Sequence, residues 1–223
     1  MTPRLSFWDS IQARKPLTVG AIADSGAFGT PSPECDIVEL RLDSLGTEDQ
    51  LLEFAKACPL PLLITARGPL EGGQSDWSIS EREKAYFKLM PYAAAIDIEL
   101  RDFDALGRVI ANAREQRVVV VGSFHHFQET PGLPELTSKL DTRADIHKFA
   151  LMATSLPCIQ AHLSLFDAHP GEALAIMGMG PLGAAARPLM AKAGSLLNYG
   201  YLGATPSAPN QWPAGLLKQA LSV

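Results

Sequence analysis

The sequence predicts an α/β protein that folds as a compact (β/α)₈ barrel of the TIM type. Short apolar runs rich in Val, Ile and Leu alternate along the chain with segments of helical spacing, and eight such runs can be recognised. Alternating strands and helices imply parallel pairing through right-handed crossovers. The 223 residues fall at the short end of the range of about 200 to over 400 residues that this fold spans.

The predicted strands are continuous apolar runs, as expected of strands that are buried on both faces. They span residues 17–22, 36–41, 61–66, 94–100, 117–122, 145–151, 172–179 and 196–202.

The segments between the strands carry helix signals. Thr47 can cap a helix that runs to Cys58, and Ser78 can cap another, with Glu81 three residues further on to complete a capping box. The first crossover, 23–35, is rich in Gly and Pro and has room for one turn of helix at most. A doubly wound open sheet is the alternative fold, but no GxGxxG sequence follows the first strand. Further helices are expected near residues 102–115, 132–142, 154–167, 183–194 and 213–222.

Length and composition suit a globular protein of one large domain or two small ones, and the barrel prediction makes residues 1–223 a single domain. Hydrophobic residues make up 47% of the chain and charged residues 19%, which is ordinary for a globular protein. No run approaches the roughly 20 apolar residues of a membrane helix, and residues 1–16 are too polar for a signal peptide, so we expect a cytoplasmic location. The net charge of −5 disfavours a general nucleic-acid-binding role but leaves room for a small anionic substrate.

Polar residues near the C-terminal ends of the predicted strands are informative, because such side chains face the reaction site of a barrel enzyme. Glu39, Arg41 and Asp43 alternate, which places all three on one strand face, and Asp97 and Glu99 alternate in the same way. A charged face inside an α/β protein is costly unless its groups pair or bind a substrate. An exposed edge strand with a salt bridge would give the same pattern.

Arg67 ends the third run, and Glu71, Gly72 and Gly73 follow it in the loop. Two adjacent glycines allow a close backbone approach, although a simple turn would also explain them.

Two adjacent histidines, His125 and His126, follow the fifth run. Histidine suits proton transfer because its ordinary pKa of about 6.5 lies near working pH. The two side chains should point in different directions, and a purely structural pair is the alternative. No HxH, HExxH or Cys/His spacing indicates a metal site.

Lys148 lies in the sixth run, on the same strand face as Ile146 and Ala150. Lysine is among the residues least often fully buried, and an amine in a low-dielectric site loses its proton more readily. The free amine can then attack a ketone and form an imine. The alternative is a strand-end lysine whose ammonium group reaches solvent.

Three polar residues follow in the last quarter of the chain. Arg187 offers a guanidinium fork that suits a carboxylate, and Ser207 and Gln211 can hold hydroxyl groups. Each can also be an ordinary surface residue.

Taken in order, these segments resemble the type I 3-dehydroquinate dehydratase family over nearly the whole chain, from about residue 17 to residue 221. The matching segments are E-x-R-x-D at 39–43, R-x-x-x-E-G-G at 67–73, S-F-H-H-F at 123–127 with T-P at 130–131, A-D-I-H-K at 144–148, M-G-M-G-x-x-G with a following arginine at 177–187, and S-A-P-N-Q at 207–211.

The resemblance implies a dimeric (β/α)₈ barrel and a hydro-lyase of the shikimate pathway that needs neither a metal nor an organic cofactor. Lys148 would form a protonated imine with the C3 ketone of 3-dehydroquinate. His125 would remove the C2 proton and later protonate the departing C1 hydroxyl, giving 3-dehydroshikimate, while Glu71 would orient the imidazole.

The resemblance also assigns the side chains that would bind the substrate. These are Arg187 at the carboxylate, Glu39, Arg41 and Arg67 at the ring hydroxyls, Met177 against the ring, and Ser207 and Gln211 from a closing loop.

Four positions depart from the family pattern. Phe124 and His126 replace the Asn and Asp that flank the histidine, Ala186 replaces a Ser, and Asn210 replaces a loop Gly. The first two changes leave open which histidine acts, and the spacing to the following T-P favours His125.

Two other functions also stay open. Another imine-forming barrel enzyme, such as a class I aldolase, would keep Lys148, and a non-catalytic binding descendant of the family would keep the fold.

Overall fold

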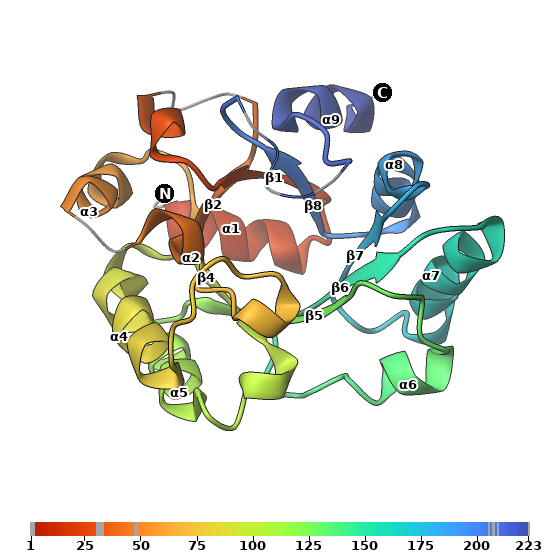
Figure 1. Ribbon diagram of the computed structural model, residues 1–223, viewed down its shortest axis with the longest axis horizontal. Coiled ribbons are helices and arrows are strands. Elements are labelled where there is room, and N and C mark those ends of the chain that lie inside the picture. Colours follow the sequence, from red (N-terminus) through yellow and green to blue (C-terminus); the bar gives the residue numbers. More distant parts are fainter. Residues whose placement is uncertain are drawn as a thin grey trace.

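A barrel of eight parallel strands forms the centre of the computed structural model, which describes residues 3–29, 34–46, 49–204, 206, 208 and 210–222 (Figure 1). Strands that follow one another in the sequence pair in parallel from β1 to β7, and β1 also pairs with β8. The predicted fold is therefore confirmed, and the open doubly wound sheet is wrong. The strands are β1 (Leu17–Ile22), β2 (Ile37–Arg41), β3 (Leu62–Thr65), β4 (Ala95–Glu99), β5 (Val119–His126), β6 (Ile146–Met152), β7 (Leu174–Met179) and β8 (Leu197–Tyr201).

The barrel closes between β7 and β8 through a few contacts instead of a regular strand ladder. The backbone N–H of Leu196 donates to Leu174 O at 2.9 Å, and the backbone N–H of Ile176 donates to Ser195 Oγ at 3.0 Å. Ser195 is fully buried, so its side chain takes the place of a missing backbone acceptor at this seam.

Helices surround the barrel in the predicted alternation (Figure 1). The capping box of α4 is present as predicted, because Ser78 Oγ accepts from the Glu81 N–H while the Glu81 carboxylate accepts from the Ser78 N–H. Thr47, the other predicted cap, lies outside the described residues. The helices are α2 (Leu42–Leu45), α3 (Asp49–Ala57), α4 (Ile79–Leu89), α5 (Gly107–Glu115), α6 (Leu133–Thr137), α7 (Leu156–Ala168), α8 (Gly183–Ala193) and α9 (Ala214–Leu221), and the 3₁₀ turns are η1 (Ser25–Gly29), η2 (Pro69–Glu71), η3 (Met90–Tyr92) and η4 (Leu100–Asp102).

An N-terminal helix, α1 (Pro3–Gln12), precedes the barrel and was not predicted. It lies across the end of the barrel at which the strands begin (Figure 1). Phe7 and Ile11, one turn apart on this helix, are buried in the same cluster as interior residues such as Leu63 and Val119. The helix therefore closes that end of the barrel with apolar side chains.

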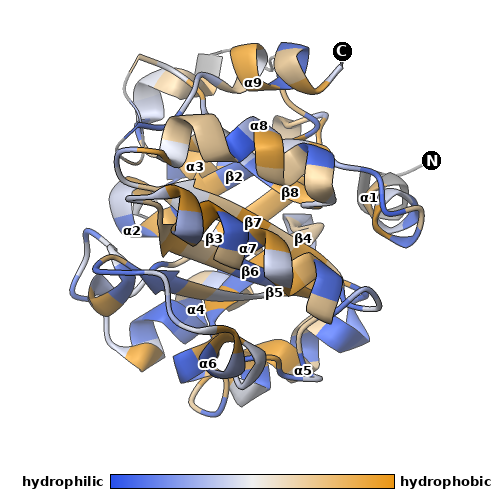
Figure 2. Ribbon diagram, turned by 90° about the vertical axis from the view of Figure 1, so that its right-hand side faces the viewer, coloured by the Kyte–Doolittle hydropathy of each residue, from blue (hydrophilic) through white to orange (hydrophobic). Residues whose placement is uncertain are grey.

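The two faces of each strand pack into different parts of the protein. On β6, Ile146 and Ala150 belong to the cluster inside the barrel, whereas Phe149 and Leu151 pack outward under the helices. Figure 2 shows the matching trend, with hydrophobic residues along the central strands β7 and β8 and mostly hydrophilic loops at the periphery. Lys148 lies between Ile146 and Ala150 on the inner face, as predicted.

Candidate active site

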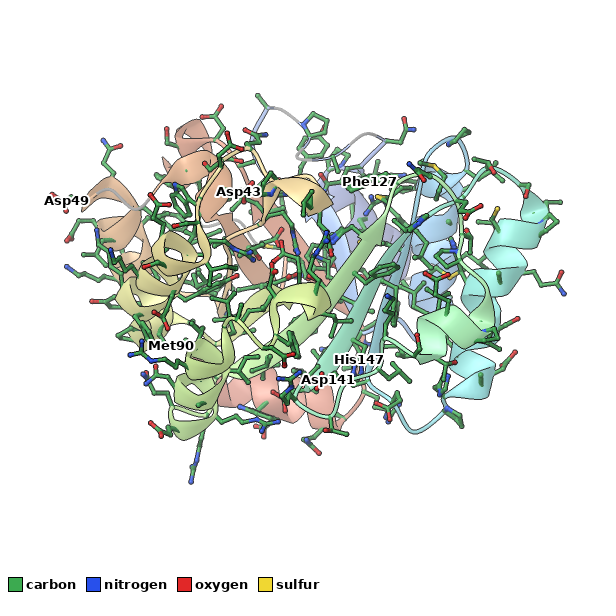
Figure 3. All side chains as sticks on the ribbon, turned by 60° about the horizontal axis from the view of Figure 1, so that its bottom comes forward. Asp43, Asp49, Met90, Phe127, Asp141 and His147 are labelled. Atoms are coloured by element: carbon green, nitrogen blue, oxygen red, sulfur yellow. The ribbon has the colours of Figure 1, made fainter. Side chains whose placement is uncertain are left out.

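One cavity of about 280 Å³ opens at the C-terminal ends of the strands. All of the predicted site residues that the structure describes line it, and Ser207 lies outside the described residues. Figure 3 shows Asp43 and Phe127 at this end of the barrel, with Met90, Asp141 and His147 toward the other end. The predicted residues that line the cavity are Glu39, Arg41, Arg67, Glu71, His125, Lys148, Met177, Arg187 and Gln211.

Lys148 is buried at the base of this cavity, with 4% of its surface exposed. Its Nζ donates to Asp97 Oδ2 at 2.8 Å and lies 4.3 Å from the ring centroid of Tyr199. The alternative of a lysine that reaches solvent is therefore wrong.

Asp97 is the anion that holds this amine. Its carboxylate accepts from Arg67 Nη2 at 2.7 Å, from Ser123 Oγ at 2.6 Å and from Lys148 Nζ. Burial alone would raise the pKa of Asp97, but Arg67 and Lys148 outweigh it and hold the pKa well below its usual range. Asp97 was not among the predicted site residues, although its alternation with Glu99 was the signal that could have identified it.

Arg67 is committed to protein partners. Besides Asp97, its guanidinium contacts Ser123 Oγ at 2.6 Å and Glu99 Oε1 at 3.3 Å. Glu99 is in turn paired with Arg82 of α4. Burying these charges is tolerable because each cation has an anion beside it, and the network fixes Asp97 in front of Lys148.

His125 and Glu71 form a hydrogen-bonded pair on one wall of the cavity. Glu71 Oε2 lies 2.9 Å from His125 Nδ1 and also accepts from the backbone N–H of His125 at 2.9 Å. An oxygen that accepts the backbone N–H is best suited to accept a proton from Nδ1 as well, which leaves Nε2 as the basic nitrogen.

The protonation of this pair follows from its surroundings. Burial, followed by the charges of Arg67 and Lys148, lowers the pKa of His125 well below its usual value, so the imidazole is neutral near pH 7. Burial raises the pKa of Glu71 to about 7, against the opposing charge of Arg67. Because the two groups are in contact, they titrate as a pair.

His126 points away from the cavity. Its Nδ1 lies 3.0 Å from the carbonyl oxygen of Glu129 and accepts from the Glu129 N–H at 3.3 Å. The two histidines therefore point in different directions, as predicted. Their expected position just past the strand is wrong, because β5 continues through His126.

Phe124 also lies outside the main cavity. Its ring packs edge-on against the ring of Phe149, with the two centroids 6.4 Å apart. The Nζ of Lys139 lies over the Phe124 ring, 5.1 Å from its centroid. Phe124 and His126 instead line a separate hollow on the far side of the His125–Glu71 pair. Neither departure from the family pattern beside His125 therefore lines the main cavity.

Glu39 and Arg41 of β2 also line the cavity. Arg41 donates to both carboxylate oxygens of Asp43, from Nε at 2.9 Å and from Nη2 at 2.8 Å. The prediction that Asp43 continues the strand face is wrong, because β2 ends at Arg41 and the chain turns into α2, which brings Asp43 back onto Arg41. Glu39 is buried and accepts from Thr65 Oγ1 at 2.8 Å.

Arg187, on α8, is a buried cation for which the described residues provide no ion pair. Its Nη1 donates to Tyr199 O at 2.9 Å, and its Nε has no partner in the part of the chain that the structure describes. Burial lowers the pKa of Arg187 to about 10. A buried, incompletely partnered guanidinium on a cavity wall suits an anionic ligand.

The described ranges contain no group of three or more His, Cys, Asp or Glu side chains that could hold a metal ion. None of the helices in the same ranges is long and apolar enough to cross a membrane.

A buried amine, a histidine–carboxylate pair and a buried arginine line one cavity at the C-terminal ends of eight parallel strands. This arrangement defines a (β/α)₈-barrel enzyme. The family model for type I 3-dehydroquinase matches residues 30–223. This chain belongs to the type I 3-dehydroquinase family, and it is a lyase. The resemblance found in the sequence is thereby confirmed.

Individual relatives agree with this assignment. The 3-dehydroquinate dehydratase of Methanococcus vannielii is 32% identical over 197 residues, which cover 84% of this chain and 88% of that protein. The catabolic 3-dehydroquinate dehydratase of Acinetobacter baylyi is 34% identical over 214 residues, and the match covers 84% of this chain and 75% of that protein. The crystal structure of the type I 3-dehydroquinate dehydratase from Clostridium difficile superposes with a TM-score of 0.81, covers 93% of this chain and 91% of its own, and at 23% identity supports the fold.

Proposed function

We propose that this protein is a 3-dehydroquinate dehydratase that acts through a Schiff base on Lys148. The observation that carries the proposal is the position of Lys148, a buried amine in the same cavity as the His125–Glu71 pair. Dehydration next to a ketone needs an electron sink and a base, and these groups supply both.

The reaction begins when Nζ of Lys148 adds to the C3 carbonyl carbon and water leaves, which gives a protonated imine. Nε2 of His125 takes the C2 proton, and the electron pair of that C–H bond moves toward the imine nitrogen. The electrons then return to break the C1–O bond, and His125 gives its proton to the departing hydroxyl, which leaves as water. Hydrolysis of the imine releases 3-dehydroshikimate and restores the amine.

Other cavity residues would bind the substrate. Arg187, which has no ion pair among the described residues, would take the carboxylate, Glu39 and Arg41 would hold ring hydroxyls, and Met177 would pack against the ring. Arg67 would bind hydroxyls less strongly than the resemblance implies, because its guanidinium already has two carboxylate partners. Ser207 and Gln211 would close the site from their loop and exclude water that hydrolyses the imine.

Borohydride trapping tests three parts of the proposal together: the role of Lys148, the formation of an imine, and 3-dehydroquinate as the substrate. With 3-dehydroquinate present, reduction should add the mass of the reduced substrate to a peptide that contains Lys148, and Lys148→Ala should abolish the addition. Lys139→Ala is the matched control, because this lysine lies over the Phe124 ring outside the main cavity and its loss should leave trapping unchanged.

The same assay separates the alternative functions. Turnover of sugar phosphates without a rise in enone absorbance from 3-dehydroquinate would favour an aldolase. Binding of 3-dehydroquinate without trapping would contradict the Schiff base and favour a non-catalytic descendant.

We also propose that residues 1–223 act as one domain without a metal or organic cofactor, in the cytoplasm and as a homodimer. The homodimer is carried over from the family resemblance, which implies a dimeric barrel. Sedimentation equilibrium that shows a monomer at micromolar concentration would contradict the dimer.

A further inference from the structure

The amine of Lys148 has a second close neighbour besides Asp97, and the mechanism above gives that neighbour no role. Tyr199, on β8, lines the cavity and is 4% exposed. Its ring centroid lies 4.3 Å from Lys148 Nζ, while Asp97 Oδ2 lies 2.8 Å from the same nitrogen. The nitrogen is therefore held by a carboxylate and an aromatic ring at once.

The barrel architecture explains why these groups meet. Glu39, Asp97, Lys148 and Tyr199 come from β2, β4, β6 and β8, and alternate strands contribute the side chains of one layer inside a barrel of this type. Tyr199 belongs to the interior apolar cluster. The layer thus consists of two carboxylates, one amine and one aromatic ring.

The ring of Tyr199, and not its hydroxyl, faces the amine. Burial raises the pKa of Tyr199 well above its usual value, and the carboxylates of Glu39 and Asp97 raise it further. The hydroxyl has no hydrogen-bond partner among the described residues. The contact with Lys148 is made by the ring and not by the hydroxyl.

We propose that the ring of Tyr199 is a positioning residue for the Lys148 nitrogen and stabilises the positive charge of the protonated imine. The inference rests on the Schiff base proposed above. An aromatic face attracts a cation within about 6 Å, and the attraction grows when water is excluded. The protonated imine has one N–H where the ammonium group has three, so it depends less on hydrogen bonds to Asp97 and more on the ring.

Three substitutions of Tyr199 distinguish the contribution of the aromatic ring from that of the hydroxyl group. Tyr199→Phe keeps the ring and should retain kcat within about twofold, because the ring face remains. Tyr199→Leu removes the ring and should lower kcat and the fraction of enzyme trapped by borohydride at steady state about tenfold, with a smaller change in KM. Tyr199→Met fills the space with a flexible apolar chain and should match the Leu variant.

Fluorinated phenylalanines at position 199 give a graded test that hardly alters shape. Each added fluorine withdraws negative potential from the ring face, so kcat and the trapped fraction should fall stepwise with the number of fluorines. Because a structural role for the ring would not produce this series, the result does not depend on whether the Leu or Met variant folds.

The outcomes distinguish this inference from the proposed function. If the wild-type protein is trapped but fluorination has no effect, or if Tyr199→Phe loses as much activity as Tyr199→Leu, the role of the ring is overturned and the Schiff base stands. If the wild-type protein is not trapped at all, the Schiff base fails first and this inference fails with it.

Discussion

At the scale of single residues, burial of charge is the feature that organises the site. A chain of alternating charges runs inward from α4, through Arg82, Glu99, Arg67 and Asp97 to Lys148. Removing one member of such a buried set leaves an uncompensated charge, which is more costly than the pair was favourable. The network therefore restricts the position of the amine and keeps an anion beside it.

Glu71 gives a prediction about pH. The backbone N–H of His125 requires an acceptor at the position of Glu71 Oε2, so in Glu71→Gln the amide oxygen should take that place and keep the same histidine tautomer. The variant loses only the negative charge that stabilises the imidazolium, and we expect kcat to fall about tenfold, less than the roughly 10²–10⁴-fold that a general base contributes.

The pH profile checks the same substitution. Burial raises the pKa of Glu71 to about 7, so the wild-type carboxylate gains a proton as the pH falls through that value, and kcat should fall with it. Glu71→Gln cannot take up this proton and should lack that acid limb. A wild-type acid limb that persists unchanged in Glu71→Gln would show that another group is responsible.

The two histidines give a second prediction at this scale. His125→Ala should lower kcat by about 10²-fold or more, because the base is lost, while borohydride trapping at Lys148 should persist, if more slowly. His126→Ala should change kcat less than about twofold, since its ring faces Glu129 outside the cavity. Greater damage from the His126 change would reverse the assignment.

Sequence patterns selected residues that line the cavity more readily than the residues that support them. Lys148 and His125 attracted attention because a lysine stands in an apolar strand and a histidine follows another, and the family resemblance assigned their roles. Tyr199 was not predicted, since an aromatic residue in a strand is equally typical of a core. Its contact with Lys148 depends on β8 closing the barrel, 51 residues further along the chain, and local periodicity contains no such information.

At the scale of secondary structure, prediction succeeded where local chemistry decides. The strands were found within a few residues, and the capping box at Ser78 and Glu81 is present. β5 extends beyond its predicted end to His126 because it pairs with β6 from Val121 through His126, which is a tertiary effect. α1 was not predicted, because its contacts with the barrel, the buried Phe7 and Ile11 and the partly buried Trp8, stand among polar residues and form no long apolar pattern.

The capping box gives a prediction about stability. Ser78→Ala removes the side-chain acceptor of the Glu81 N–H and should lower the free energy of unfolding by about 1 kcal/mol, or the melting temperature by about 2–4 °C. Calorimetry measures both. Ser80→Ala is the control, because Ser80 is exposed two residues further along the same helix, and its replacement should not destabilise the protein. Equal losses in the two variants would argue against a capping contribution.

At the scale of the whole molecule, the eightfold alternation of strands and helices could be predicted, but the way the barrel closes could not. At the seam between β7 and β8, the hydroxyl of Ser195 connects the two strands. It accepts from the Ile176 N–H at 3.0 Å and donates to Leu197 O at 3.3 Å. Nothing in the sequence around a single serine indicates that it replaces part of a strand ladder. The site depends on this closure, because β7 carries Met177 and β8 carries Tyr199.

Ser195→Ala tests the seam. The substitution leaves the buried N–H of Ile176 without its acceptor, and an unsatisfied buried donor costs about 1–3 kcal/mol, so urea denaturation should show a loss of that size. Amide exchange should quicken at Ile176, while amides of β3 and β4, on the far side of the barrel, keep their protection. Ser164→Ala, which removes a hydroxyl bonded to Gln160 O on the outer helix α7, should change neither quantity. If exchange at Ile176 stays slow in Ser195→Ala, the backbone contact between Leu196 and Leu174 alone holds the barrel closed, and the serine is not part of its closure.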